Sequence, residues 1–232
     1  LYSFCYSDKD ISNKLITQLK GYEKIAVISE QNEYNLGIQQ AIESKLADQV
    51  VISETFEKTT TDFRNTIEKV LKTQPDAIML NPFPGPTATA LGKQLNENLE
   101  ALTDIQLVSQ IAYLTDDSRT EFPEVAEGMI VVDAPAVQSS AGQEFIAQVK
   151  ANQGAIPKLE GYLTLSLHDA LYNLVAAANA VGKDSVKARD YLVSNKAKGL
   201  AVEGQKFEGK NFIQGFEAGV FKIQDAKAVA QD

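Results

Sequence analysis

Five short apolar runs, rich in β-branched residues, recur at nearly constant spacing. They start at Lys24, Val50, Ala77, Ile105 and Met129, so successive starts lie 26, 27, 28 and 24 residues apart. The runs are mostly continuous rather than alternating, which is typical of parallel strands buried on both faces. We therefore predict an α/β fold, in which a Rossmann-like parallel sheet carries helices on both faces.

Helical periodicity fills the intervals between these runs. Apolar residues fall on one helical face in the segments 11–19, 38–46, 63–71 and 91–99. Thr60, Thr61 and Asp62 are expected to cap the third segment, and Pro86 suits the first turn of the fourth. The resulting β-α-β-α order predicts right-handed crossovers.

The rhythm changes after Val132. Helices are predicted at about 141–152, 162–181 and 185–194, and the segment 162–181 is the most apolar of them. Its stripe of Leu167, Leu171, Leu174 and Val175 calls for a packing partner. The segment 215–223 indicates a closing strand or hairpin.

Composition excludes several classes of function. Hydrophobic residues make up 44% of the 232-residue chain, which favours a folded protein over a disordered one. The formal charge of −9 argues against nucleic acid and anionic membrane surfaces as partners. No run of about 18 apolar residues is present to span a membrane. The single cysteine, Cys5, allows no internal disulfide and is expected to be an ordinary strand or loop residue.

Signals for catalysis are weak. His168 is the single histidine, and its neighbour Asp169 is expected to point about 100° away on a helix, so the two are not predicted to form a dyad. Neither a P-loop nor a Gly-x-Ser-x-Gly motif occurs. We predict no enzyme activity, no metal site and no cofactor.

Candidate binding residues follow the predicted strands. In an open α/β sheet, ligands bind beyond the carboxyl ends of the strands. Aromatic and short polar side chains gather there, which suits a small-molecule site. The six candidates are Ser29, Tyr34, Asn81, Phe83, Ile111 and Tyr113. The alternative is that Tyr34 and Phe83 merely cover seams between loops and core.

An ordered set of segments extends over nearly the whole chain. It comprises Lys24-Ile25-Ala26-Val27-Ile28, Tyr34-Asn35-Leu36-Gly37, Thr60-Thr61-Asp62-Phe63, Gln74-Pro75-Asp76-Ala77-Ile78 and Gly215-Phe216-Glu217-Ala218-Gly219-Val220-Phe221. The set resembles the leucine/isoleucine/valine-binding protein family, the type I periplasmic solute receptors of ABC importers.

The resemblance implies two Rossmann-like lobes joined by three crossovers, with ligand held between them. Residues 1–157 would form a crossover and the second lobe, residues 158–211 would return to the first lobe, and residues 212–232 would close the second. The first half of the other lobe would then be absent from this chain. The orphaned helix 162–181 is expected to pair with a second copy as a homodimer or to refold onto its own lobe.

The resemblance also implies a function. The protein is expected to bind a small organic molecule, amino-acid-like or a small carboxylate or amide, and to deliver it to an ABC permease. It would be periplasmic or extracellular, with its export signal outside this chain. The family's acidic residue that meets an amino-acid ammonium aligns near Ile111, so a ligand without an ammonium fits better. The alternatives are a ligand-sensing domain of a receptor or regulator and, less favoured, an α/β enzyme.

Overall fold

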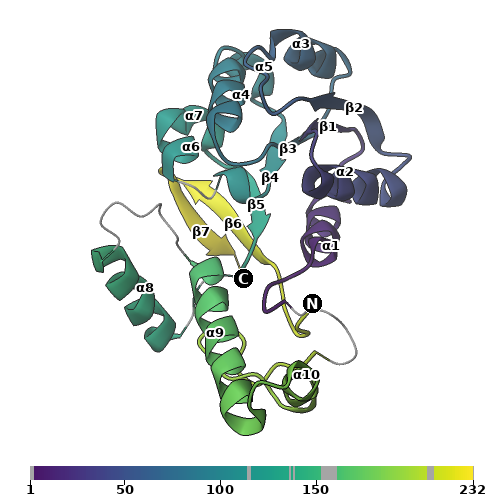
Figure 1. Ribbon diagram of the computed structural model, residues 1–232. Helices are drawn as coiled ribbons and strands as arrows, with labels where there is room; N and C mark the ends of the chain where they lie inside the picture. The colour runs from purple at the N-terminus through teal and green to yellow at the C-terminus, as the bar shows by residue number, and fades with distance from the viewer. Residues whose placement is uncertain are drawn as a thin grey trace. The chain divides into compact units, whose positions relative to one another are not determined.

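The chain divides into two compact units. The computed structural model describes residues 3–113, 116–135, 137, 139–152, 161–207 and 212–231 (Figure 1). Unit 1 comprises Leu1–Ser7 and Ala134–Glu217, and unit 2 comprises Asp8–Asp133 and Ala218–Asp232, so the chain crosses between them three times. The sequence-based ranges place residues 1–7, 134–157 and 212–217 with the second lobe or its crossover, whereas contacts group them with unit 1.

Unit 2 is built on one sheet. Its seven strands lie in the order β2-β1-β3-β4-β5-β6-β7. The neighbours among the first five are parallel, whereas β6 and β7 form an antiparallel hairpin beside β5. The strands are β1 (Ile25–Glu30), β2 (Val50–Phe56), β3 (Ala77–Asn81), β4 (Gln106–Ser109), β5 (Ile130–Asp133), β6 (Gly219–Gln224) and β7 (Lys227–Gln231). The predicted parallel sheet is confirmed. The closing element predicted over 215–223 is a hairpin that begins at Gly219 and extends to Gln231.

Helices cover both faces of this sheet, as predicted. Figure 1 shows α1 (Asp8–Leu19) and α2 (Glu33–Lys45) on one side, with α4 (Pro86–Asn96), α6 (Asp116–Glu121) and α7 (Pro123–Ala126) on the other. The remaining elements of the unit are α3 (Arg64–Lys72), α5 (Leu99–Leu102) and the short 3₁₀ helix η1 (Ile111–Tyr113).

The central strands carry the core. Every residue of β1 and β3 is buried, because each lies between two other strands and under helices on both faces. The same expectation is wrong for β2. That strand is at the edge of the sheet, and Val51 is largely exposed there.

Two helix boundaries differ from the predicted ones. Helix α3 begins at Arg64, whose N–H donates to Asp62 Oδ1 at 3.1 Å, and Asp62 is one of the three predicted caps. The N–H of Phe63 donates to Gln94 Oε1 at 2.6 Å. The expected helix over 91–99 ends at Asn96, and α5 begins after a break. Pro86 does occupy the first turn of α4, as predicted.

Unit 1 has a small core of its own. Its helices are α8 (Ser140–Asn152), α9 (Tyr162–Val181) and α10 (Ser185–Ser194), close to the predicted ranges. The rings of Phe4 and Phe207 meet edge to face with centroids 5.1 Å apart. Around them pack Ala197, Val202 and Ile213.

Helix α9 presents an apolar side to solvent. Its buried side includes the polar residues Ser166, Asp169 and Asn173, whereas the side chains of Leu167 and Leu171 are 60% and 64% exposed. Amphipathic helices normally show the reverse arrangement. The predicted stripe therefore lies on the surface of unit 1. Among the described residues, no helix is long and apolar enough to cross a membrane.

Candidate functional site

The predicted site residues lie at or near the carboxyl ends of the strands of the unit 2 sheet. We call this region the carboxyl rim and define it as residues 29–34, 81–86 and 109–113, which end or follow β1, β3 and β4. These three strands are parallel neighbours, so their carboxyl ends meet. The strand order reverses between β1 and β3, because β2 follows β1 on one side and β4 follows β3 on the other. Ligands bind at such switch points in open α/β sheets.

Ser29 and Asn81 join the two strands at this switch point. They are paired across β1 and β3, and Asn81 Nδ2 donates to Ser29 Oγ at 3.0 Å. Both side chains are completely buried. The structure thus places these two predicted site residues inside the end of the sheet, where they link β1 to β3.

Asn35 and Asn81 bind each other's backbone. Asn35 Nδ2 donates to the carbonyl of Asn81 at 2.7 Å, and Asn81 Nδ2 donates to the carbonyl of Asn35 at 2.8 Å. The pair fastens the first turn of α2, which carries Tyr34, to the end of β3. Sequence reasoning did not assign Asn35 to the site. Its signal was a small polar residue in the first turn of a helix directly after a buried strand.

Phe83 is the most exposed aromatic residue on the rim. Its side chain is 50% exposed, although Pro82 on one side of it is buried. Its N–H donates to Glu30 Oε2 at 2.9 Å, and Gln110 Nε2 donates to the carbonyl of Pro82 at 3.0 Å. Glu30 and Gln110 are buried and were also missed by sequence reasoning.

The other three candidates differ in exposure. Tyr34 and Ile111 are half-buried, so both can meet a ligand at the surface of the rim. Tyr113 is buried, and its hydroxyl lies beside Gly92 of α4. Burial raises the pKa of the Tyr113 phenol, which stays neutral. Tyr34, Phe83 and Ile111 are thus surface groups of the carboxyl rim, whereas Ser29, Asn81 and Tyr113 are buried within it.

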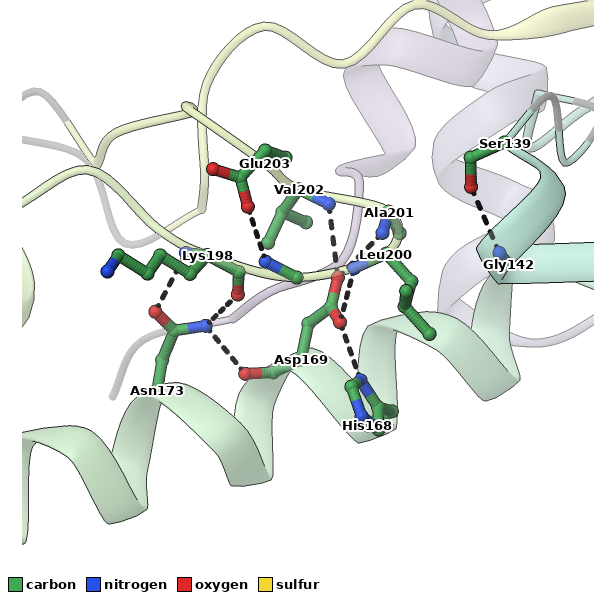
Figure 2. A network of polar contacts seen from close by, with 11 residues as sticks. Ser139, Gly142, His168, Asp169, Asn173, Lys198, Leu200, Ala201, Val202 and Glu203 are labelled. Atoms are coloured by element: carbon green, nitrogen blue, oxygen red, sulfur yellow. Dashed lines mark hydrogen bonds and ion pairs between the residues drawn. The ribbon is translucent and has the colours of Figure 1, made fainter. Parts of the chain in front are cut away.

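His168 and Asp169 in unit 1 do contact each other, which corrects the sequence-based prediction. His168 Nδ1 lies 2.8 Å from Asp169 Oδ1. Asp169 is buried and accepts the backbone N–H groups of Leu200, Ala201 and Val202 at 2.8, 2.7 and 3.1 Å (Figure 2). These bonds occupy the carboxylate, so its role is to hold the loop against α9.

A hollow of about 220 Å³ lies elsewhere in unit 1, lined by residues of α9, α10 and the segment 195–198. Its buried amide, Asn173, is engaged with the backbone of Asp169 and Lys198. The backbone of unit 1 therefore already occupies this amide. Among the described residues, no group of three His, Cys, Asp or Glu side chains is arranged to hold a metal ion.

The chain has the fold of the type I periplasmic binding proteins. A solute-binding protein of an ABC transporter from Rhodopseudomonas palustris, solved with p-hydroxybenzoic acid, aligns with a TM-score of 0.79 and 17% identity over 97% of this chain and 63% of its own.

Two further solved structures have the same fold. A branched-chain amino acid ABC transporter periplasmic ligand-binding protein from Burkholderia xenovorans aligns with a TM-score of 0.76 and 18% identity over 100% of this chain and 64% of its own. A leucine-binding protein from Thermotoga maritima aligns with a TM-score of 0.75 and 14% identity over 97% of this chain and 65% of its own.

The chain thus spans 63–65% of the length of these three proteins. No model of a protein family matches the chain, and no curated protein matches it in sequence.

Proposed function

We propose that unit 2 is a ligand-binding lobe of a solute-binding protein. The proposal rests mainly on Phe83, whose ring is half-exposed at the switch point of the sheet. Hydrogen bonds with Glu30 and Gln110 hold the backbone of this residue in place. Tyr34 and Ile111 add half-buried aromatic and apolar surface on the same rim. The solved structures of the same fold include solute-binding proteins, which supports a binding role.

The ligand is a small organic molecule with an aromatic or aliphatic body. Ile111 offers no charge for an ammonium group, so an amino acid would lack a charge-assisted hydrogen bond of about 1.5–3 kcal/mol at that place. A small aromatic or aliphatic carboxylate or amide suits this rim better. The R. palustris protein, solved with p-hydroxybenzoic acid, makes 4-hydroxybenzoate a suitable first probe.

The wider role is that of the receptor component of an ABC importer, acting outside the cytoplasm and delivering ligand to a permease. The ligand would shift the population toward a closed state through its higher affinity for that state, and no covalent bond would change. Genes for a permease and an ATPase beside the gene for this chain would favour import. Their absence, with a signalling gene in their place, would favour the alternative, a ligand-sensing domain of a receptor or regulator.

The exposed side of α9 supports a second proposal, a homodimer through residues 162–181. A row of leucines that is more than half exposed is unusual on a monomer surface. A second copy would cover that row with an identical one, as two-fold symmetric dimers do.

Isothermal titration with 4-hydroxybenzoate and with leucine tests the binding proposal. Replacing Phe83 by alanine removes the exposed ring, and we expect about a tenfold loss of affinity for the better probe. The matched control is Phe212→Ala, which removes a similarly exposed ring from unit 1. The proposal fails if neither probe binds, or if both substitutions reduce affinity equally.

A further inference from the structure

A single peptide group on the carboxyl rim is bound from both sides. The carbonyl of Pro82 and the N–H of Phe83 belong to the same peptide plane. Gln110 Nε2 donates to the carbonyl at 3.0 Å, and Glu30 Oε2 accepts from the N–H at 2.9 Å. Resting on the proposed function, we infer that Glu30 and Gln110 are positioning residues that orient Phe83 for ligand.

The two prolines that flank Phe83 restrict the backbone around it, so the torsions beside the Pro82–Phe83 peptide are the ones that can still move the ring. Pro82 and Pro84 have fixed φ angles, and Pro84 also disfavours the helical region for Phe83. Rotation about the bonds on either side of the Pro82–Phe83 peptide would swing the Phe83 ring. Hydrogen bonds at both ends of the plane oppose that rotation. A ring that is held before ligand arrives loses less entropy on binding.

Glu30 also connects this peptide to the other aromatic segment. Its second oxygen, Oε1, accepts from Asn32 Nδ2 at 3.3 Å. Asn32 caps α2 by accepting the N–H of Asn35 at 2.9 Å, so its own amide orientation is fixed. One carboxylate therefore links the loop that carries Phe83 with the helix start that carries Tyr34. A glutamine at position 30 has an NH₂ group in place of one of these two oxygens, so it would present a donor to one of the two donors.

Both positioning side chains are buried at strand ends. Glu30 ends β1 and Gln110 follows β4, and β3, which leads into Pro82, lies between these two strands. Burial excludes water as a competitor for the two hydrogen bonds, which makes them more effective. The geometry also predicts that loss of either bond acts on Phe83 without changing the strands.

The test compares Glu30→Gln and Gln110→Met with matched controls. Glu23→Gln removes an exposed charge just before β1, outside the carboxyl rim, and Gln94→Met removes a buried glutamine that binds the 61–63 backbone instead. The measured quantities are the hydrogen-exchange rate of the Phe83 amide, the melting temperature, and the Kd of 4-hydroxybenzoate. Gln110→Met serves as the second variant if Glu30→Gln fails to fold.

We expect exchange at Phe83 to rise about tenfold in Glu30→Gln, and Kd to rise about three- to tenfold in both variants. Exchange at Ile28 and Leu80 should be unchanged, as should Kd in both controls. The inference is overturned if exchange at Phe83 is unaltered, or if it rises while Kd stays constant. In the latter case the proposed function still stands. If the parent chain binds no probe, both proposals fail.

Discussion

The buried hydroxyl of Tyr113 shows how one atom affects the stability of unit 2. It has no hydrogen-bond partner among the described residues, and burial raises the pKa of its phenol above the ordinary value. A buried polar group without a partner costs free energy, and so does its ionisation. Tyr113 therefore contributes packing through its ring and a penalty through its oxygen.

Replacing Tyr113 by phenylalanine is expected to increase the free energy of unfolding by about 1 kcal/mol at neutral pH, because the unsatisfied hydroxyl is removed. The parent should also lose stability above about pH 10, where the unfolded chain gives up the phenolic proton and the folded chain keeps it. Tyr113→Phe should reduce that loss by up to about 1.4 kcal/mol for each pH unit.

Urea unfolding between pH 7 and 11 measures both effects. The exposed Tyr172 supplies the control, since Tyr172→Phe removes a hydroxyl that is not buried and should not increase the stability at pH 7. A Tyr113→Phe protein that is less stable than the parent at pH 7 would show that the hydroxyl has a partner.

Among the elements, α9 and the loop after α10 depend on one buried carboxylate. Asp169 binds three successive backbone N–H groups, and Gly199 passes so close that an added Cβ would overlap the carboxylate. The side chain and the glycine thus form one structural unit (Figure 2). This arrangement explains why a charged residue lies on the buried side of an apolar helix.

We expect Asp169→Ala to reduce the free energy of unfolding of unit 1 by about 2–4 kcal/mol, because three buried donors lose their acceptor. Gly199→Ala should cost about 2–3 kcal/mol, since it displaces the carboxylate. The double variant should cost less than the sum of the two single variants, because the clash with the carboxylate is absent once Asp169 is removed. The positive φ of Gly199 leaves a smaller cost for alanine at that position.

Thermal unfolding of the four proteins in this cycle gives the coupling energy. Gly21→Ala, where an added Cβ meets no atom within 4 Å, should have little effect. Additive costs in the double variant would contradict the proposed dependence of Asp169 on Gly199.

The sequence was sufficient for most elements because apolar periodicity follows burial. The continuous runs of β1 and β3 become fully buried strands, as such runs predict. The apolar run of β2 resembles those of β1 and β3 in sequence, but β2 is an edge strand and is only partly buried. Periodicity does not predict the order of the strands, so it could not show this difference. The sequence predicted candidate site residues where strands end, but it did not identify Glu30, Asn35 or Gln110. Their hydrogen-bond partners lie 53, 46 and 28 residues away in the chain, respectively, and such distant contacts leave no local pattern.

For the whole molecule, the proposed homodimer through the exposed leucines of α9 can be tested by sedimentation. If these residues form a homodimer, sedimentation of the parent should show a dimer at micromolar concentration. Leu167→Glu with Leu171→Glu should give a monomer, because charges would be buried in the interface. The control is Val51→Glu on the edge strand of unit 2, which is also exposed. A monomeric parent would contradict the homodimer.

The most direct test of the central claim is an NMR titration of the 232-residue chain with 4-hydroxybenzoate and, separately, leucine. A single lobe covers only part of a ligand, so we expect a Kd of about 1 mM for the better probe. The account predicts that amide shift changes concentrate at residues 29–34, 81–86 and 109–113. Changes centred on the unit 1 hollow around Asn173 and Tyr191, or no changes at about 10 mM probe, would contradict it.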